Sequence, residues 1–202
     1  MGDDMSTAFV VGNGTSRKPI SLEALKQYGP IYACNAVYRD FRPDYLVAVD
    51  AKMVLEICKT GWQKHNKVYT NHNKQLNDIQ GLNILNPSKG WSSGPTALDL
   101  ASDHGHDPIY LLGFDFKGTT GTGKGDDKVN NLYAGTFNYK RENDPATYFG
   151  NWERQVGIIC QRNHRKRYIR VVAEGDKFLP GSLKNFTNLS HVNIEEFQKI
   201  FG

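Results

Sequence analysis

An apolar run that ends in a glycine-rich turn stands near the N-terminus: Ala8-Phe9-Val10-Val11-Gly12-Asn13-Gly14-Thr15-Ser16. Four consecutive apolar residues that stop at a glycine are typical of a buried parallel strand. In an open α/β sheet such a turn lies at the carboxyl edge, where ligands bind. Because glycine permits positive φ and close approach, we expect the amides of this turn to point at a phosphate. A plain β-turn is the alternative, since the third glycine of the dinucleotide fingerprint is absent.

Strands and helices alternate along the rest of the chain. The further expected strands are Ile31–Cys34, Tyr45–Val49, Lys67–Thr70, Leu82–Leu85, Ile109–Leu112 and, as the last one, Tyr168–Val172. The expected helices are Pro19–Gln27, Ala51–Lys59, Ser93–His104, Tyr148–Asn163 and Ile194–Phe201. This alternation implies right-handed crossovers and a mostly parallel sheet with helices on both faces. We therefore expect an α/β fold with a single Rossmann-like domain over residues 1–202.

Composition favours an intracellular globular protein with an anionic ligand. The 202 residues carry a net charge of +4, which suits a nucleotide and also suits weak contact with nucleic acid. The three cysteines match no metal spacing and are typical of reduced thiols in the cytoplasm. No apolar run is long enough to cross a bilayer, and the acidic N-terminus does not resemble a signal peptide. The sequence thus predicts a cytoplasmic protein without a membrane partner.

Two further polar sites follow or precede expected elements. Asn35 ends the second strand and is either a turn residue or a ligand for a ribose or base. Ser92-Ser93-Gly94-Pro95 begins a helix, with Ser93 as the expected N-cap. The free amides at a helix N-terminus are a natural anion site, so this segment either binds phosphate or only caps the helix.

Acidic side chains stand at the ends of strands. Asp50 follows the third expected strand, Asp115 follows the central one, and Asp44 precedes the third. Carboxylates at such positions bind Mg²⁺ together with substrate phosphates, take a proton, or hold a sugar hydroxyl. Helix capping and turn formation are the alternatives.

The segment 118–145 is rich in Gly, Thr, Asn and Lys and shows no period, which indicates a long flexible lid loop. Its start resembles a P-loop, but Gly125 stands where Ser or Thr must reach Mg²⁺. We expect a lid that closes over an anion with Lys117, Lys124 and Lys128 rather than a nucleoside triphosphatase loop.

A basic run lies near the C-terminal end of the fourth long helix: Arg162, Arg165, Lys166 and Arg167, with Arg170 nearby. Cations suit a solvated helix C-terminus, and this interpretation is favoured over contact with nucleic acid. The motifs of serine hydrolases, zinc proteases and dithiol enzymes are absent from the sequence.

Several of these segments occur in a characteristic order. They are the glycine-rich turn, Ile31–Asn35, Arg42–Asp50, Ser93–Ala101 and Ile109–Phe116. As an ordered set over about residues 8–116, this resembles the Rossmann-like core of the motility-associated (Maf) flagellin glycosylation factors and the related 6-hydroxymethylpterin diphosphokinase-like proteins. It is also similar to bacterial sialyltransferases that use CMP-sialic acid.

The resemblance implies roles for particular residues. The nucleotide phosphates would be surrounded by Gly12, Asn13, Gly14, Thr15, Ser16, Asn35, Ser92, Ser93 and Gly94. Asp115 matches the acid close to the reacting centre. The chain departs from the sialyltransferases at Lys117, where they have a tyrosine, and it has no histidine over 118–150, where they place a base.

Three functions remain open at this point. The first is a glycosyltransferase-like enzyme with a nucleotide-sugar donor of the CMP type, in which Asp115 or Asp50 activates the acceptor and Lys117 supports the leaving phosphate. The second is a diphosphokinase in which Asp50 and Asp115 hold Mg²⁺ for ATP. The third is a non-catalytic nucleotide-binding protein. No cofactor other than this Mg²⁺ is indicated, and the acceptor and the oligomeric state stay open.

Overall fold

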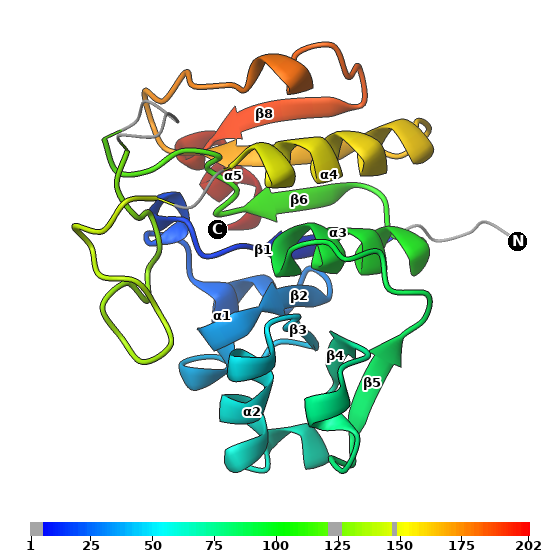
Figure 1. The fold of residues 1–202 in the computed structure, drawn as a ribbon. Coiled ribbons are helices and arrows are strands. Elements are labelled where there is room, and N and C mark those ends of the chain that lie inside the picture. The colour runs from blue at the N-terminus through cyan, green and yellow to red at the C-terminus, as the bar shows by residue number, and fades with distance from the viewer. Residues whose placement is uncertain (1–5, 121–126, 147–148) are drawn as a thin grey trace, which may run out of the picture.

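A computed structural model describes residues 6–120, 127–146 and 149–202 of the chain. It contains one eight-stranded sheet with the order β5-β4-β3-β2-β1-β6-β7-β8, and every neighbouring pair of strands is parallel (Figure 1). The expected α/β fold is therefore confirmed, with a sheet that is wholly rather than mostly parallel. In the described part of the chain no helix is long and apolar enough to cross a membrane.

The elements have the following bounds. The strands are β1 (Ala8–Val11), β2 (Ile31–Cys34), β3 (Tyr45–Val47), β4 (Val68–Asn71), β5 (Leu82–Leu85), β6 (Ile109–Leu112), β7 (Tyr168–Val172) and β8 (Leu189–Asn193). The α-helices are α1 (Leu22–Leu25), α2 (Ala51–Lys59), α3 (Ser93–Asp103), α4 (Gly150–Arg162) and α5 (Ile194–Phe201).

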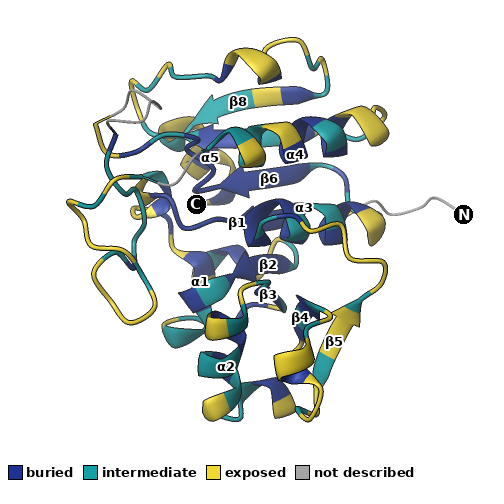
Figure 2. Ribbon diagram, viewed as in Figure 1, coloured by how far each residue is buried: buried dark blue, intermediate teal, exposed yellow. Residues whose placement is uncertain are grey.

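Helices cover both faces of the sheet, because successive strand residues point to opposite sides. Phe9 and Val11 of β1 pack in one apolar core with residues of α1, α2 and α5. Ala8 and Val10 pack in a second core with residues of α3 and α4. All four residues of β1 are fully buried, which explains the unbroken apolar run (Figure 2).

The chain reverses its direction of travel across the sheet between β1 and β6. Strands β1 to β5 step outward one after another, and β6 then returns to pair with β1 on its free side. Ligands of open α/β sheets bind at the carboxyl ends of the strands at such a switch point. The turns after β1 and β6 are thus the two loops that frame the expected crevice.

The structure differs from the sequence expectation at several elements. Strand β3 ends at Val47, two residues before the expected end at Val49. Strand β8 was not expected, because β7 was taken as the last strand; the segment Leu189–Asn193 is half polar, as an edge strand with one neighbour can be. The helix expected over Pro19–Gln27 is only the single turn α1, which Ser21 caps. The helix expected from Tyr148 begins at Gly150, and Tyr148 itself lies outside the described residues.

Candidate functional site

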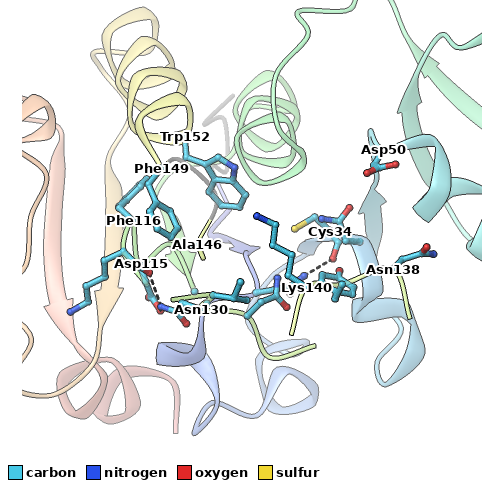
Figure 3. Close-up of a pocket in the computed structure, with 18 residues that line it drawn as sticks. Cys34, Asp50, Asp115, Phe116, Asn130, Asn138, Lys140, Ala146, Phe149 and Trp152 are labelled. Atoms are coloured by element: carbon cyan, nitrogen blue, oxygen red, sulfur yellow. Dashed lines mark hydrogen bonds between the residues drawn. The ribbon is translucent and has the colours of Figure 1, made fainter. Parts of the chain in front are cut away.

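A cavity of about 390 Å³ opens at the carboxyl ends of β1, β2, β3 and β6 (Figure 3). Six of the residues predicted to form a site line it: Asn13, Gly14, Asn35, Asp50, Asp115 and Lys117. The other predicted residues, Gly12, Thr15, Ser16, Ser92, Ser93 and Gly94, are not among its lining residues. The cavity therefore gathers residues from four separate strand ends, and it lies where the switch point places a ligand.

The amides of the glycine-rich turn donate to the protein itself. Those of Gly12 and Gly14 donate to the carbonyl oxygens of Leu112 and Gly113, at N–O distances of 2.7 and 3.0 Å. The amide of Thr15 donates to Oδ1 of Asn130, 2.8 Å away. These bonds fasten the turn after β1 to the loop after β6. Phosphate binding by the same amides stays a prediction, and it requires that these acceptors be exchanged for a ligand.

The glycines are required by close packing of the two turns. A Cβ on Gly12 would lie 2.8 Å from the Gly113 oxygen, and a Cβ on Gly14 would lie 2.5 Å from Oδ2 of Asp115. Gly14 has a φ of −61°, so the expected use of positive φ is wrong at this position. Positive φ occurs instead at Gly113, where φ is +72°. The close approach that the glycines permit is between protein segments.

The carboxylate of Asp115 is a fixed negative charge in the cavity wall. It accepts hydrogen bonds from the hydroxyl of Ser16, from the Ser16 amide at 3.2 Å and from Nδ2 of Asn130 at 3.0 Å. The residue is 8% exposed. An ionised carboxylate offers about four lone-pair sites. Three bonds to protein groups therefore already engage this carboxylate, and its use as a base stays a prediction.

Two buried arginines brace the loops that carry these groups. Arg17 donates from Nε to the Gly12 oxygen, 2.8 Å away, and from Nη2 to Oδ1 of Asn13, 3.1 Å away. Arg170, on β7, donates to the carbonyl oxygens of Phe114, Asp115 and Phe178 at 2.6, 3.1 and 3.2 Å.

Burial lowers the pKa of Arg170, and the negative charges of Asp115 and Asp176 oppose that effect. The signal in the sequence was a charged residue inside the apolar strand β7. Sequence analysis grouped Arg170 with the basic run and did not single out Arg17, so it missed the bracing role of both.

Asn35 and Ser93 form a link between strand ends. The Ser93 hydroxyl accepts from the Val49 amide and donates to Oδ1 of Asn35, with both distances 3.1 Å. The N-cap of α3 is Ser92, not Ser93 as expected. Since Ser93 is only 5% exposed, it acts inside the protein, and its contact with a phosphate stays a prediction.

Asp50 combines a structural contact with a place in the cavity. Its carboxylate caps α2 by accepting from the Lys52 amide at 2.9 Å, which is the helix-capping role that the sequence offered as an alternative to chemistry. The residue is exposed and lines the same cavity as Asp115. Among the described residues no three His, Cys, Asp or Glu side chains gather to hold a metal, so a Mg²⁺ ion here would depend on phosphate oxygens as well.

Left-handed backbone is concentrated at the cavity. Within the described ranges, three non-glycine residues have positive φ: Asn35 at 56°, Phe116 at 57° and Asn138 at 67°. All three line the cavity. Such conformations cost about 1–3 kcal/mol each and are found preferentially at functional sites. Phe116 is the most unusual, because bulky residues rarely adopt this region, and the Arg170 guanidinium lies over its ring at 5.2 Å.

The described part of the expected lid, 118–120 and 127–145, is tied to the body of the protein. Within the segment, Asp127 is fully buried and accepts from the amides of Gly118, Thr120 and Lys128 at 2.8, 2.8 and 2.9 Å. Toward the body, the Leu132 amide donates to the Asn13 oxygen at 2.9 Å. The Tyr139 hydroxyl accepts from the Ala36 amide at 3.2 Å. Lys124 lies outside the described residues. These contacts place Lys140 and Asn138 at the cavity (Figure 3).

The charged groups at the cavity are few. The charged side chains among its lining residues are Asp50, Asp115, Lys117 and Lys140. Lys117 forms an ion pair with Asp176 at 2.7 Å. Burial alone would raise the pKa of Asp176, but the hydrogen bond from Lys117 keeps it below its usual value. Cys34 also lines the cavity, and burial raises the pKa of its thiol to about 12, so it is not a thiolate nucleophile.

The basic run lies at the end of the sheet opposite to the cavity. It follows α4 and precedes β7, so it stands at the amino ends of the strands. Arg167 forms an ion pair with Asp107 at 3.1 Å, Lys166 donates to the His106 oxygen at 3.1 Å, and Arg162 lies over the Trp91 ring at 5.7 Å. These contacts join the run to neighbouring protein groups, and none of its residues lines the cavity.

Three aromatic residues at the cavity were given no role by sequence analysis. Phe116, Phe149 and Trp152 line it, although Phe116 ends one of the segments that carry the resemblance. Gly94, predicted to bind phosphate, lies against the Trp152 indole: a Cβ on Gly94 would be 2.5 Å from its ring.

The resemblance to the Maf and diphosphokinase-like proteins stays a prediction. Comparison of the chain with protein-family models, curated proteins and solved structures found no significant match.

Proposed function

We propose that this chain is a nucleotide-dependent transferase and that the cavity at the β1–β6 switch point binds the nucleotide part of its donor. The observation that carries the proposal is the convergence of Asn13, Asn35, Asp50 and Asp115, from four strand ends, on one cavity. All the left-handed non-glycine residues of the described chain lie at this cavity as well. Strained backbone and convergent polar groups together favour a binding or catalytic site over a packing defect.

The polar lining suits a nucleotide sugar. Five asparagines line the cavity, namely Asn13, Asn35, Asn130, Asn131 and Asn138. Carboxamides both donate and accept. The carboxamide atoms without a protein partner among the described residues, Nδ2 of Asn35 and Asn131 and Oδ1 of Asn138, match ribose and sugar hydroxyls and the edges of bases. The two lysines at the cavity are balanced by its two aspartates, and Lys117 is also paired with Asp176. This near-neutral lining favours a donor with one or two phosphates, such as a CMP-type sugar, over a triphosphate.

The transfer would proceed by displacement at the sugar. An acceptor hydroxyl attacks the anomeric carbon, the bond from that carbon to the phosphate oxygen breaks, and the phosphate leaves with the electron pair. Asp115 or Asp50 accepts the proton of the acceptor hydroxyl. Lys140 stabilises the negative charge of the leaving phosphate, and Lys117 joins it only by exchanging its ion pair with Asp176. Both aspartates line the cavity, and Asp50 is the more exposed of the two.

A second candidate is a diphosphokinase that uses Mg²⁺ and ATP. The observation in its favour is that Asp50 and Asp115 line the same cavity. Carboxylates and substrate phosphates together are the usual ligands of catalytic Mg²⁺. A non-catalytic nucleotide-binding protein is the third candidate, and the full engagement of Ser16 and Asn130 with Asp115 supports it.

Thermal unfolding in the presence of nucleotides tests the proposal. The panel is CMP, UDP, GDP, ATP and the corresponding nucleotide sugars, each with Mg²⁺ and with EDTA. A ligand at 100 times its Kd stabilises the native state by about 2.7 kcal/mol, so true binding gives a clear rise in Tm. We expect CMP- or UDP-type compounds to raise Tm in EDTA. A rise only with ATP and Mg²⁺ would favour the diphosphokinase, and no rise with any nucleotide would overturn the proposal.

Two variants separate catalysis from binding. Asparagine caps helices as well as aspartate does, so Asp50→Asn should fold like the wild type and report on chemistry alone. If the wild type hydrolyses or transfers a bound nucleotide sugar, Asp115→Asn or Asp50→Asn should slow turnover by about 10²–10⁴-fold, the usual contribution of a general base. Binding without turnover in the wild type would leave the non-catalytic candidate.

A further inference from the structure

The cavity has two unlike walls. Figure 3 shows Trp152, Phe149 and Phe116 on one side and Asp50 and Asn138 on the other. The aromatic side comes from the start of α4 and the loop after β6. The polar side comes from the loops after β2 and β3 and from the segment around Asn138. A ligand with one apolar planar end and one polar end would match both walls.

The Trp152 indole is held in place before any ligand arrives. Gly94 lies so close to it that a Cβ there would be 2.5 and 2.6 Å from two of its ring carbons. The Phe114 ring packs on it at a centroid distance of 5.5 Å and an interplanar angle of 54°. The side chain is half-buried and lines the cavity. A ring that is already fixed loses little conformational freedom when a ligand stacks on it.

Planar heterocycles gain most from such a surface. A base stacks favourably on an aromatic side chain, and the gain tolerates any of the bases because each has a π-face. The phosphate end of a nucleotide would lose hydration against the apolar side, whereas Lys140 at the cavity can offset its negative charge. The two walls therefore define one orientation of the ligand.

We infer that the Trp152 indole is the stacking platform for the nucleobase, with Gly94 as the residue that positions it and the ribose and phosphate turned toward Asn35 and Asn138. This inference rests on the proposed function, because it assigns the orientation of the same nucleotide. It also gives Gly94 a role other than the phosphate contact that the resemblance implies.

Binding of mononucleotides and of a base-free analogue tests the inference. The probes are CMP, UMP, AMP and GMP, with ribose 5-phosphate as the analogue without a base and a free hexose as a sugar control. Affinity is measured by calorimetry and stacking by quenching of tryptophan fluorescence. We expect at least one mononucleotide to bind at least tenfold more tightly than ribose 5-phosphate, which corresponds to about 1.4 kcal/mol. It should quench the fluorescence, and the hexose should not.

Four variants locate the effect. Trp152→Leu should weaken the mononucleotide at least tenfold and leave ribose 5-phosphate unchanged, while Trp152→Phe should keep part of the affinity. Gly94→Ala retains the indole but displaces it, so it should also weaken the mononucleotide selectively. Trp62→Phe is the matched control, because Trp62 packs against Tyr38 and does not line the cavity. It should keep both the affinity and the quenching. Urea unfolding of each variant verifies that it is folded.

The outcomes distinguish this inference from the proposed function. If mononucleotides bind but ribose 5-phosphate binds equally well, or if folded Trp152→Leu binds mononucleotides like the wild type, the platform is wrong and the nucleotide site stands. If the hexose quenches as strongly as the best nucleotide, the aromatic wall recognises sugar and the inference is again wrong. If no mononucleotide binds the wild type, both the inference and the proposed function are wrong.

Discussion

The carboxylate of Asp115, after β6, accepts hydrogen bonds from both the amide and the hydroxyl of Ser16, after β1. The two residues are 99 positions apart in the chain. Their contact closes the carboxyl edge of the sheet at the switch point, and Asn130 joins it from the loop that follows. The floor of the cavity is therefore a hydrogen-bonded network rather than an open turn.

Removal of the Ser16 hydroxyl should weaken this network. Ser16→Ala deletes one hydrogen bond to a charged acceptor, which is worth about 1.5–3 kcal/mol. We expect the urea midpoint to fall with an unchanged m-value. Ser182→Ala is the control, because its hydroxyl bonds to Glu153 at an exposed site and should cost much less. Equal midpoints for Ser16→Ala and the wild type would show that the network adds no stability.

Alanine at Gly14 should be poorly tolerated. Its Cβ would lie 2.5 Å from Oδ2 of Asp115 and 2.7 Å from the Gly113 oxygen, so either the turn or the carboxylate must move. Such overpacking costs about 1–3 kcal/mol. Gly181→Ala is the matched control, because nothing lies within 4 Å of the Cβ added there. Thermal unfolding should show a lower Tm for Gly14→Ala and a Tm near the wild type for Gly181→Ala; a reversed order would contradict the close packing.

Loss of the Arg170 guanidinium should be strongly destabilising. Arg170→Met leaves three carbonyl oxygens without their donor, and an unsatisfied buried polar group costs about 1–3 kcal/mol. Lysine should not rescue the loss, because an ammonium cannot reproduce the planar fork of donors. Arg165→Met, at an exposed position of the basic run, should leave the urea midpoint within about 0.5 kcal/mol of the wild type. A small effect of both Arg170 variants would remove its bracing role.

Stability should fall when the pH drops below the ordinary range of histidine. Burial lowers the pKa values of His104 and His106, which contact the Tyr32 hydroxyl at 2.5 and 3.1 Å. The unfolded chain therefore binds protons at a higher pH than the folded chain. The stabilising contribution is present above the unfolded pKa of about 6.5 and is lost as the pH falls through it toward the lowered folded values.

Urea unfolding between pH 7.5 and pH 5 measures this dependence. The double variant His104→Gln/His106→Gln should reduce the slope of the profile over that range, and His191, whose pKa burial also lowers, should keep the remainder. His164→Gln, at an exposed position after α4, is the control and should keep the wild-type slope. A double variant with the wild-type slope would assign the pH dependence to other groups.

Local sequence patterns were sufficient for the fold class. The apolar run of β1, the strand and helix periods and the bounds of α2 and α5 match the structure because they depend on neighbours within a few residues. The edge strand β8 was missed, since an edge strand alternates weakly and has polar residues. The helix α1 was predicted too long, because only the single turn Leu22–Leu25 that Ser21 caps is helical.

The sequence by itself determined that polar residues and glycines would end β1, β2, β3 and β6, and that these ends would meet at one edge of a parallel sheet. Only the tertiary structure decided what those residues contact. It showed that the Asp115 carboxylate packs against Gly14, that the Trp152 indole packs against Gly94, and that Arg170 holds the loop after β6 by hydrogen bonds. The physical reason is that such contacts join segments far apart in the chain, and their partners are chosen by close packing in three dimensions rather than by any local period.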